Sequence, residues 1–181
     1  MLKAISNSST LIRLYRTTSF LAPLKKLYEQ VLIPDFCWAE LLKKPDYKAN
    51  ISMKEDIDKF LVIVKPTTDE MKLASELIFT IKEITDLSLD LPEAVAIAIA
   101  EKRGINQVLS EDKVAISVPY LIELNIEVLN SLEILKVLIQ EKILHVTTRQ
   151  EFEKLIAKFE SESRERFRKK DIMKIMDELL R

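Results

Sequence analysis

Short apolar runs and longer amphipathic segments alternate along the chain. The short runs are rich in β-branched residues and end at turn residues or proline, which predicts strands at 2–6, 30–34, 60–64, 106–110 and 126–129. Apolar positions spaced three and four apart predict helices at about 20–29, 35–44, 51–59, 68–85, 91–103, 112–124, 131–140, 148–160 and 171–180. A further helical pattern starts after the hydroxyl residues at 8–10. The alternation favours an α/β fold with a mainly parallel central sheet of about five strands and helices on both faces.

The helix predicted at 91–103 has well-marked ends. Asp90 is the expected N-cap, Pro92 falls in the first turn, and Glu93 would complete a capping box. Gly104 is expected just past the helix in the left-handed conformation. The segment between them is apolar nearly all round, so we expect this helix to be buried.

The chain length of 181 residues is enough for one domain with a sizeable core. We expect residues 1–145 to form this α/β domain and residues 146–181 to form an α-helical C-terminal extension. A dense charge run at 161–170 would connect the domain to the last helix. That helix carries a broad apolar stripe, which packs either on the same domain or at a subunit interface.

The composition excludes several kinds of site. The single glycine excludes the glycine-rich loops that cradle phosphates or dinucleotides. With one cysteine and one histidine, neither a thiolate zinc cluster nor a multi-histidine metal site can form. The net charge of −1 means that any nucleic-acid contact must come from a local basic patch. Enzymatic chemistry would therefore depend on carboxylates, hydroxyls and the ions that they bind.

Polar side chains gather where predicted strands end and helices begin. In open parallel sheets, ligands bind beyond the carboxyl ends of the strands. The residues at such places are Asn7, Ser9, Glu40, Glu93, Ser110, Glu111 and Asp112. Carboxylates gathered at one edge repel one another unless a counter-charge is present. An oxygen-only ligand set suits Mg²⁺ or Mn²⁺, ions that support phosphodiester hydrolysis.

Each of these residues also has a purely structural interpretation. Glu40 is followed by lysines three and four positions later, which is typical of a solvated ion-paired face. The capping box accounts for Glu93 without any chemistry. Asp112 is an ordinary acidic residue for a helix start, and Asn7 an ordinary turn residue. The argument for a site depends on the spacing of all four against the order of the strands.

Four motifs in this order resemble the PIN-domain family, over nearly the whole chain. The family pattern opens with a strand ending in D-x-S/T, and here N-S-S stands at 7–9. A strand ending in I-P then leads into a helix with a glutamate, here V-L-I-P-D-F-C-W-A-E, which ends at Glu40. The buried helix opens with P-E-A-V-A-I-A-I-A, giving Glu93. The last motif, T-x-D or a close variant, corresponds to S-E-D at 110–112.

The resemblance implies a PIN-like α/β domain that hydrolyses single-stranded RNA with Mg²⁺ or Mn²⁺. Glu40, Glu93 and Asp112 would be the catalytic metal ligands, directly or through water, together with Asn7 at the first ligand position. Ser9 and Ser110 would support them, and Glu111 would be an extra carboxylate. Many relatives are VapC-like toxins of toxin–antitoxin pairs, which implies an antitoxin-like protein partner and a homodimer.

The departure from the family pattern is Asn7, which stands where relatives have an acid. Asparagine keeps an oxygen but loses the negative charge, so the affinity for a divalent ion should fall. Three explanations remain open: a weakened enzyme, an inactive module that binds RNA or a protein partner, or an introduced inactivating substitution. We rank weakened or lost activity above full activity.

Two basic segments are candidates for contact with RNA. One consists of Arg164, Arg166 and Arg168, near Phe167, although interleaved glutamates also fit a solvated helix. The other consists of Arg13 and Arg16, beside the first motif. The longest apolar run is far too short to span a bilayer, and no signal peptide is evident. A cytoplasmic protein without membrane contact is therefore expected.

Overall fold

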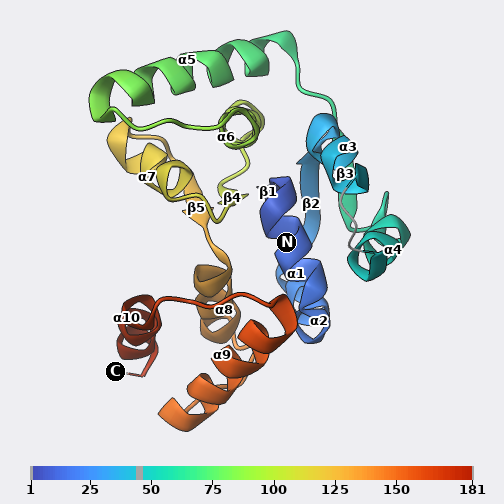
Figure 1. The fold of residues 1–181 in the computed structure, drawn as a ribbon, viewed down its shortest axis with the longest axis vertical. Helices are drawn as coiled ribbons and strands as arrows, with labels where there is room; N and C mark the ends of the chain where they lie inside the picture. The colour runs from blue at the N-terminus through green and yellow to red at the C-terminus, as the bar shows by residue number, and fades with distance from the viewer. Residues whose placement is uncertain (1, 44–46, 181) are drawn as a thin grey trace.

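The computed structural model describes residues 2–43 and 47–180, apart from the side chains of 47–51. The strands are β1 (Leu2–Ser6), β2 (Tyr28–Pro34), β3 (Leu61–Val64), β4 (Gln107–Leu109) and β5 (Glu127–Leu129). The helices are α1 (Ser8–Arg16), α2 (Thr18–Leu27), α3 (Asp35–Lys43), α4 (Tyr47–Asp56), α5 (Thr68–Thr85), α6 (Leu91–Arg103), α7 (Lys113–Leu121), α8 (Ser131–Gln140), α9 (Arg149–Ser163) and α10 (Lys169–Leu179) (Figure 1). Among the described residues, no helix has both the length and the apolarity needed to cross a bilayer.

The five strands form one parallel sheet in the order β3-β2-β1-β4-β5. This confirms the predicted α/β fold with its central parallel sheet. Strand β1 is central, with Ile5 opposite Leu32 of β2 and Ser6 opposite Leu109 of β4. The carboxyl ends of β1 and β4 therefore lie side by side, and the residues that follow them are brought to the same edge.

Alternation along the strands divides the interior into two cores, one on each face of the sheet. Ala4 and Leu109 belong to one core, and their neighbours Ile5 and Val108 belong to the other. Because successive side chains of a strand point to opposite faces, both faces must be apolar in a sheet that helices cover on two sides. The short, nearly continuous apolar runs in the sequence follow from this double burial.

Different helices cover the two faces (Figure 1). Helices α5, α6 and α7 contribute to the core that contains Ile5. Helices α1, α2, α8, α9 and α10 contribute to the core that contains Ala4. The buried residues of the last two helices include Phe152, Phe159 and Met176. The C-terminal helices thus share a core with the helices that flank β1.

The ends of α6 match the sequence in part. Gly104 has a φ of 66° and donates its backbone N–H to Ala100, as predicted for a left-handed C-cap. The helix is buried along its apolar segment, as predicted. The predicted capping box is wrong: Asp90 occupies the N-cap position, but its side chain makes no capping hydrogen bond. The carboxylate of Glu93 is instead directed to a residue that follows β1.

The boundary between α2 and β2 also differs from the prediction. The helix expected at 20–29 ends at Leu27, and strand β2 begins at Tyr28. Tyr28 pairs with Leu2 in the sheet and is 1% exposed. The helical spacing continues past Leu27 in the sequence, but pairing with β1 and burial of the tyrosine ring extend the strand backwards.

Candidate active site

Asn7 lies at the junction of β1 and α1 and is 2% exposed. Its Oδ1 is the N-cap acceptor of α1, bonded by the backbone N–H of Thr10 at 3.0 Å and by the Ser9 hydroxyl at 3.1 Å. Its Nδ2 donates to Oε1 of Glu93 at 2.7 Å and to Oγ of Ser110 at 3.3 Å. The side chain therefore joins the ends of β1 and β4 to the start of α6.

These contacts determine the orientation of the Asn7 amide. A flipped amide would direct Nδ2 at the N–H of Thr10 and Oδ1 at the carboxylate of Glu93, and both contacts would be repulsive. The amide nitrogen must therefore face Glu93. A carboxylate at this position could accept from Thr10 in the same way, but its second oxygen would face the Glu93 carboxylate, and the pair would need a proton or a cation.

The environment of Glu93 perturbs the pKa of its carboxyl group. Burial is the main cause that raises its pKa above the usual 4.5, and the charges of Asp112 and Asp90 raise it further. The hydrogen bond from Asn7 acts in the opposite direction and lowers the pKa. The ionised carboxylate is thus poorly stabilised by its surroundings, and the hydrogen bond from the Asn7 amide offsets part of this effect.

Asp112 lies at the start of α7, close enough to Glu93 for their charges to interact. It is the N-cap of α7, because its Oδ1 accepts from the backbone N–H of Ala115 at 2.8 Å. Its own backbone N–H donates to Oγ of Ser110 at 3.2 Å. Ser110 therefore contacts both Asn7 and Asp112 and connects the two predicted ligand positions.

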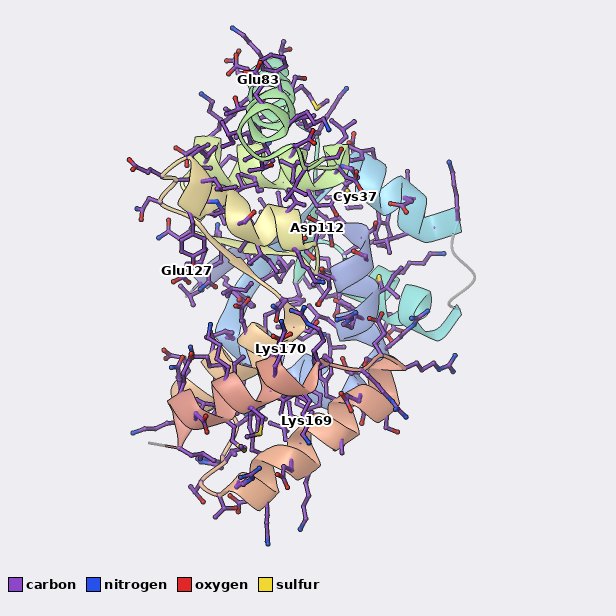
Figure 2. The ribbon with its side chains drawn as sticks, turned by 60° about the vertical axis from the view of Figure 1, so that its left-hand side comes forward. Cys37, Glu83, Asp112, Glu127, Lys169 and Lys170 are labelled. Carbon is purple, nitrogen blue, oxygen red and sulfur yellow. The ribbon has the colours of Figure 1, made fainter. Side chains whose placement is uncertain are left out.

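Glu40 extends from α3, the helix that follows β2, and is exposed. Its Oε2 accepts from the Ser8 hydroxyl at 2.6 Å. The thiol of Cys37 is fully buried, which is the main reason that its pKa rises to about 12; the charges of Glu40 and then Glu93 add to this effect. Both carboxylates are thus close to one thiol, and that thiol is an inert core group, as its apolar sequence context suggests. Figure 2 shows Cys37 in α3 and Asp112 at the start of α7.

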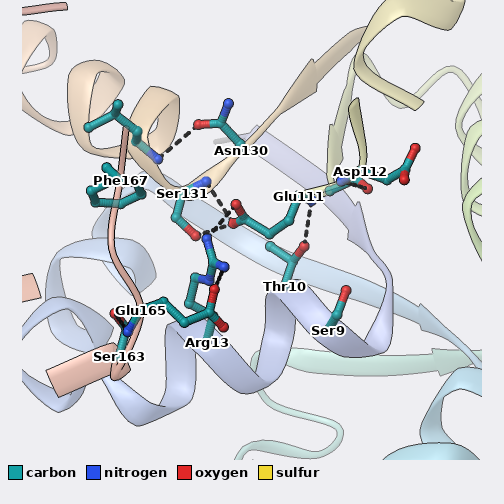
Figure 3. A network of polar contacts seen from close by, with 12 residues as sticks. Ser9, Thr10, Arg13, Glu111, Asp112, Asn130, Ser131, Ser163, Glu165 and Phe167 are labelled. Carbon is teal, nitrogen blue, oxygen red and sulfur yellow. Dashed lines mark hydrogen bonds and ion pairs between the residues drawn. The ribbon is translucent and has the colours of Figure 1, made fainter. Parts of the chain in front are cut away.

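Glu111 points away from Asp112, as Figure 3 shows. Its Oε2 accepts from Nη1 of Arg13 at 2.6 Å. Its Oε1 accepts from the backbone N–H of Ser131 at 2.9 Å and from the Ser131 hydroxyl. Its backbone N–H donates to the Thr10 hydroxyl at 3.1 Å. This carboxylate joins α1, β4 and α8, and it is directed away from Asn7.

The predicted RNA-binding arginines fall into two structural groups. Arg13 is paired with Glu111 and with Glu165, and burial is the main cause that lowers its pKa from the usual value of an arginine (Figure 3). Arg16 lies on the same helix, and its side chain is partly buried. The other arginines, Arg164, Arg166 and Arg168, lie in the exposed segment between α9 and α10.

The segment 164–168 is attached to the domain by an aromatic contact. The Phe167 ring stacks on Phe159 with 5.3 Å between centroids, and Phe159 meets Phe20 edge-on at 5.2 Å. The backbone N–H of Phe167 donates to Glu160 at 2.7 Å. The ring therefore anchors the segment between the two helices.

The donor set fits a divalent ion only in part. Carboxylate, amide and hydroxyl oxygens are the ligand types that Mg²⁺ and Mn²⁺ prefer. Among the described residues, however, no three or more His, Cys, Asp and Glu side chains form a group that could hold a metal ion. The amide nitrogen of Asn7 already satisfies Glu93, while Glu40 is bonded to Ser8. As arranged here, the side chains do not form a complete metal site.

The structure thus brings Asn7, Glu93, Ser110 and Asp112 together, with Glu40 nearby and Glu111 directed elsewhere. The sequence analysis missed Ser8, which binds Glu40, and Thr10, which supports both Asn7 and Glu111. The signal was present, because Ser8 and Thr10 flank Ser9 in one run of hydroxyl residues after the first strand. Of this run, the family motif gives a role only to Ser9.

Comparisons with known proteins found solved structures that are similar to this chain. A chain of the VapBC2 structure from Rickettsia felis, solved bound to a DNA fragment from the promoter, has 13% identity and a TM-score of 0.54. The alignment covers 71% of the present chain and 98% of that chain. VapC20 from Mycobacterium tuberculosis, a toxin that cleaves the sarcin–ricin loop, has 14% identity and a TM-score of 0.44 over 58% of this chain and 86% of that one. No curated protein matches the chain.

The family comparison covers almost the whole chain. The family model DUF3368, described as a PIN domain, matches residues 3–178. This range includes every strand except the first residue of β1, all of the residues placed at the candidate site, and nearly all of α10. The chain therefore belongs to the PIN-domain family.

Proposed function

We propose that the protein is a PIN-type endoribonuclease that requires Mg²⁺ or Mn²⁺ and cleaves single-stranded RNA, with metal affinity and cleavage weakened by Asn7. PIN nucleases generally use divalent metal ions. The observation that carries the proposal is the meeting of Asn7, Glu93, Ser110 and Asp112 at the carboxyl edge of the sheet. This edge is where ligands bind in open parallel sheets.

The acids have distinct roles in this proposal. Glu93 and Asp112 would hold the ion, with Glu40 contributing directly or through water, and the ion would stabilise the charge that develops on the phosphodiester. Ser110 positions Asn7 and Asp112 through its hydroxyl, and Ser9 bonds Oδ1 of Asn7. Asn7 adds no charge, and its nitrogen takes up the Glu93 oxygen that an ion would need.

The proposed biological setting is a toxin–antitoxin pair in the cytoplasm, with the protein as the toxin and as a homodimer. The support comes from the family and from the fold likeness to a VapBC chain. We assign residues 1–145 to the nuclease domain and 146–181 to an extension that packs on the same domain. Burial of Phe152 and Met176 in the core beside β1 supports this packing.

A second candidate is a catalytically inactive PIN module that binds RNA or a protein partner. One observation favours it: both ends of the Asn7 amide are satisfied within the protein, and the carboxylate that it contacts is already hydrogen-bonded. Polar side chains that already have hydrogen-bond partners within the protein gain less from binding an ion. The two candidates differ in metal binding and in cleavage.

The deciding experiment compares RNA cleavage by the unmodified chain, Asn7→Asp and Asn7→Asp/Asp112→Asn, each with Mg²⁺ and with Mn²⁺. Binding of Mn²⁺ is measured on the same proteins by titration calorimetry. We expect weak or no cleavage by the unmodified chain, clear cleavage and tighter Mn²⁺ binding by Asn7→Asp, and loss of both in the double variant. Asn7→Asp that neither binds Mn²⁺ nor cuts single-stranded RNA would reject the nuclease and leave the inactive module.

A further inference from the structure

A pocket of about 630 Å³ opens next to the candidate active site, between α7, α8, the segment 164–168 and α10. Its wall on α7 includes Lys113, Ile116 and Tyr120, which share one helix face because they lie three and four positions apart. Lys113 directly follows Asp112, so the pocket begins where the acidic site ends. In Figure 2, the start of α10, marked by Lys170, lies below Asp112 and α7.

The charges that line this pocket do not balance. Six cationic side chains face four carboxylates. All four carboxylates are engaged within the fold: Glu178 pairs with Lys136, Asp171 pairs with Arg168, Glu111 is held by Arg13, and Glu133 closes the capping box of α8. The pocket therefore has surplus positive charge.

Three lining cations carry this surplus. Lys113, Arg166 and Lys174 are exposed, and among the described residues they have no carboxylate partner. They come from α7, from the segment 164–168 and from α10, so three separate parts of the chain direct charge into one pocket. Cations that lie close together repel one another when no anion is bound between them. A phosphate group can neutralise several such cations at once.

Tyr120 adds an aromatic surface at the same place. It is 84% exposed, the most exposed of the large hydrophobic side chains among the described residues. Exposed aromatic rings beside cations are a stacking platform for the bases of single strands. The volume lies within the range of pockets that hold a small organic ligand, so one nucleotide can enter.

We propose that this pocket binds one nucleotide of single-stranded RNA, with the backbone phosphate between Arg166, Lys174 and Lys113 and a base on Tyr120; the inference rests on the proposed function for its choice of RNA. The pocket would hold the strand beside Glu93 and Asp112, and it would not contact the bond that is cleaved. Phe167 anchors the segment that presents Arg166, through its stacking on Phe159. The segment between α9 and α10 thus serves as a clamp on the strand.

The test measures binding of a short fluorescein-labelled oligouridylate by fluorescence anisotropy in EDTA, so that no cleavage is needed. The variant Arg166→Gln/Lys174→Gln is compared with Lys154→Gln/Lys158→Gln, which makes the same change in charge on the exposed side of α9. We expect the pocket variant to weaken binding about tenfold and to reduce the slope of log K against log salt by about 0.7, the value for one phosphate on a single strand. The α9 variant should retain the slope.

Tyr120 gives an independent measurement. Tyr120→Ala should weaken binding by about fivefold or more, whereas Tyr120→Phe should bind as the unmodified chain does, because stacking needs the ring and not the hydroxyl. Equal losses in the pocket and α9 variants, or an unchanged slope in the pocket variant, would overturn the proposal; the surplus charge would then suit an acidic protein segment.

The outcome is separable from that of the nuclease assay. If Asn7→Asp cuts RNA but binding does not depend on the pocket, the pocket proposal fails and the nuclease stands. If the pocket variant loses binding and no variant cuts with either metal, the pocket stands and the nuclease fails. Thermal melting of each variant checks that it is folded.

Discussion

The side chain of Asn7 donates a 2.7 Å hydrogen bond to the carboxylate of Glu93 across 86 positions of the chain. The contact joins the central strand to the start of the buried helix α6. It replaces a repulsion between two carboxylates by a hydrogen bond to a charged group, which contributes roughly 1.5–3 kcal/mol. The residue that we propose weakens the metal site therefore stabilises the fold when no ion is bound.

Asn7→Asp should reverse this relation. In EDTA the new carboxylate faces Glu93, and we expect the free energy of unfolding to fall by about 1–3 kcal/mol. Mn²⁺ should restore it, because an ion that binds only the folded state stabilises it by mass action. Thermal melts with and without Mn²⁺ measure both effects, and an equal response of the variant and the unmodified chain to Mn²⁺ would contradict the argument.

The matched control for this prediction is Asn7→Asp/Glu93→Gln. The pair would regain a hydrogen bond with the donor and acceptor exchanged, and the number of charges at the contact would equal that of the unmodified chain. We expect stability in EDTA to return and the response to Mn²⁺ to be lost. If Mn²⁺ still stabilises this double variant strongly, Glu93 is not part of an ion site.

Glu93→Gln should change how stability depends on pH. The folded-state pKa of Glu93 is raised above 4.5, mainly by burial, so the folded protein holds this proton more tightly than the unfolded chain. The contribution of Glu93 to stability therefore falls as pH rises from 4.5 through the raised pKa. Glutamine does not ionise, so it does not lose stability as pH rises, and its side-chain carbonyl can still accept a hydrogen bond from Asn7.

Urea unfolding at a series of pH values measures this effect. Glu93→Gln should be more stable than the unmodified chain at neutral pH, and the difference should shrink as pH falls towards 4.5. The exposed Glu101 on the same helix gives the control Glu101→Gln, for which we expect no such trend. If the stability difference between Glu93→Gln and the unmodified chain grows as pH falls, the expected direction of the effect is wrong.

Arg13→Gln should destabilise the protein by about 2–4 kcal/mol, because it leaves Glu111 without its charge partner. The side chain of Arg13 is 15% exposed and that of Glu111 is 20% exposed, so water can solvate the unpaired Glu111 carboxylate only poorly. Glu165 is 43% exposed, and Glu165→Gln should cost less than about 1 kcal/mol. Chemical denaturation of the two variants side by side tests the asymmetry, and equal losses would contradict it.

Phe167→Ala should release the segment 164–168 without unfolding the sheet. The ring stacks on Phe159 and is partly buried, so we expect a loss of about 2 kcal/mol and faster trypsin cleavage at the arginines of the segment. Phe79→Ala removes a ring that is 63% exposed on α5 and serves as the control, with a change within about 0.5 kcal/mol. An unchanged cleavage rate at the segment would show that the stack does not hold it.

The strands and the family motifs could be predicted from the sequence because both are local patterns. Double burial makes each strand a short apolar run, and the polar residues at the strand ends stand out against these runs. The spacing of Asn7, Glu93 and Asp112 against the strand order was sufficient to place them at one edge. The meeting of these residues could thus be predicted from topology together with residue type.

The partners of individual side chains could not be predicted in this way. Asp90 and Glu93 have the spacing of a capping box, but Glu93 bonds Asn7 instead, because a buried carboxylate gains more from an amide donor than from a helix end that water can reach. The pairing of Arg13 with Glu111, 98 positions away, could likewise not be predicted. Neither partner, Asn7 for Glu93 or Glu111 for Arg13, can be identified from the local sequence.

The pairing of β1 with β4 also determines when the site can form during synthesis. Asn7 leaves the ribosome 103 positions before Ser110, which it contacts in the folded protein. Closure of so long a loop is entropically costly and slow compared with helix formation. A nascent chain can therefore build α1, α2 and β2 while its acidic edge is still incomplete, so the helices on one face form before the candidate site does.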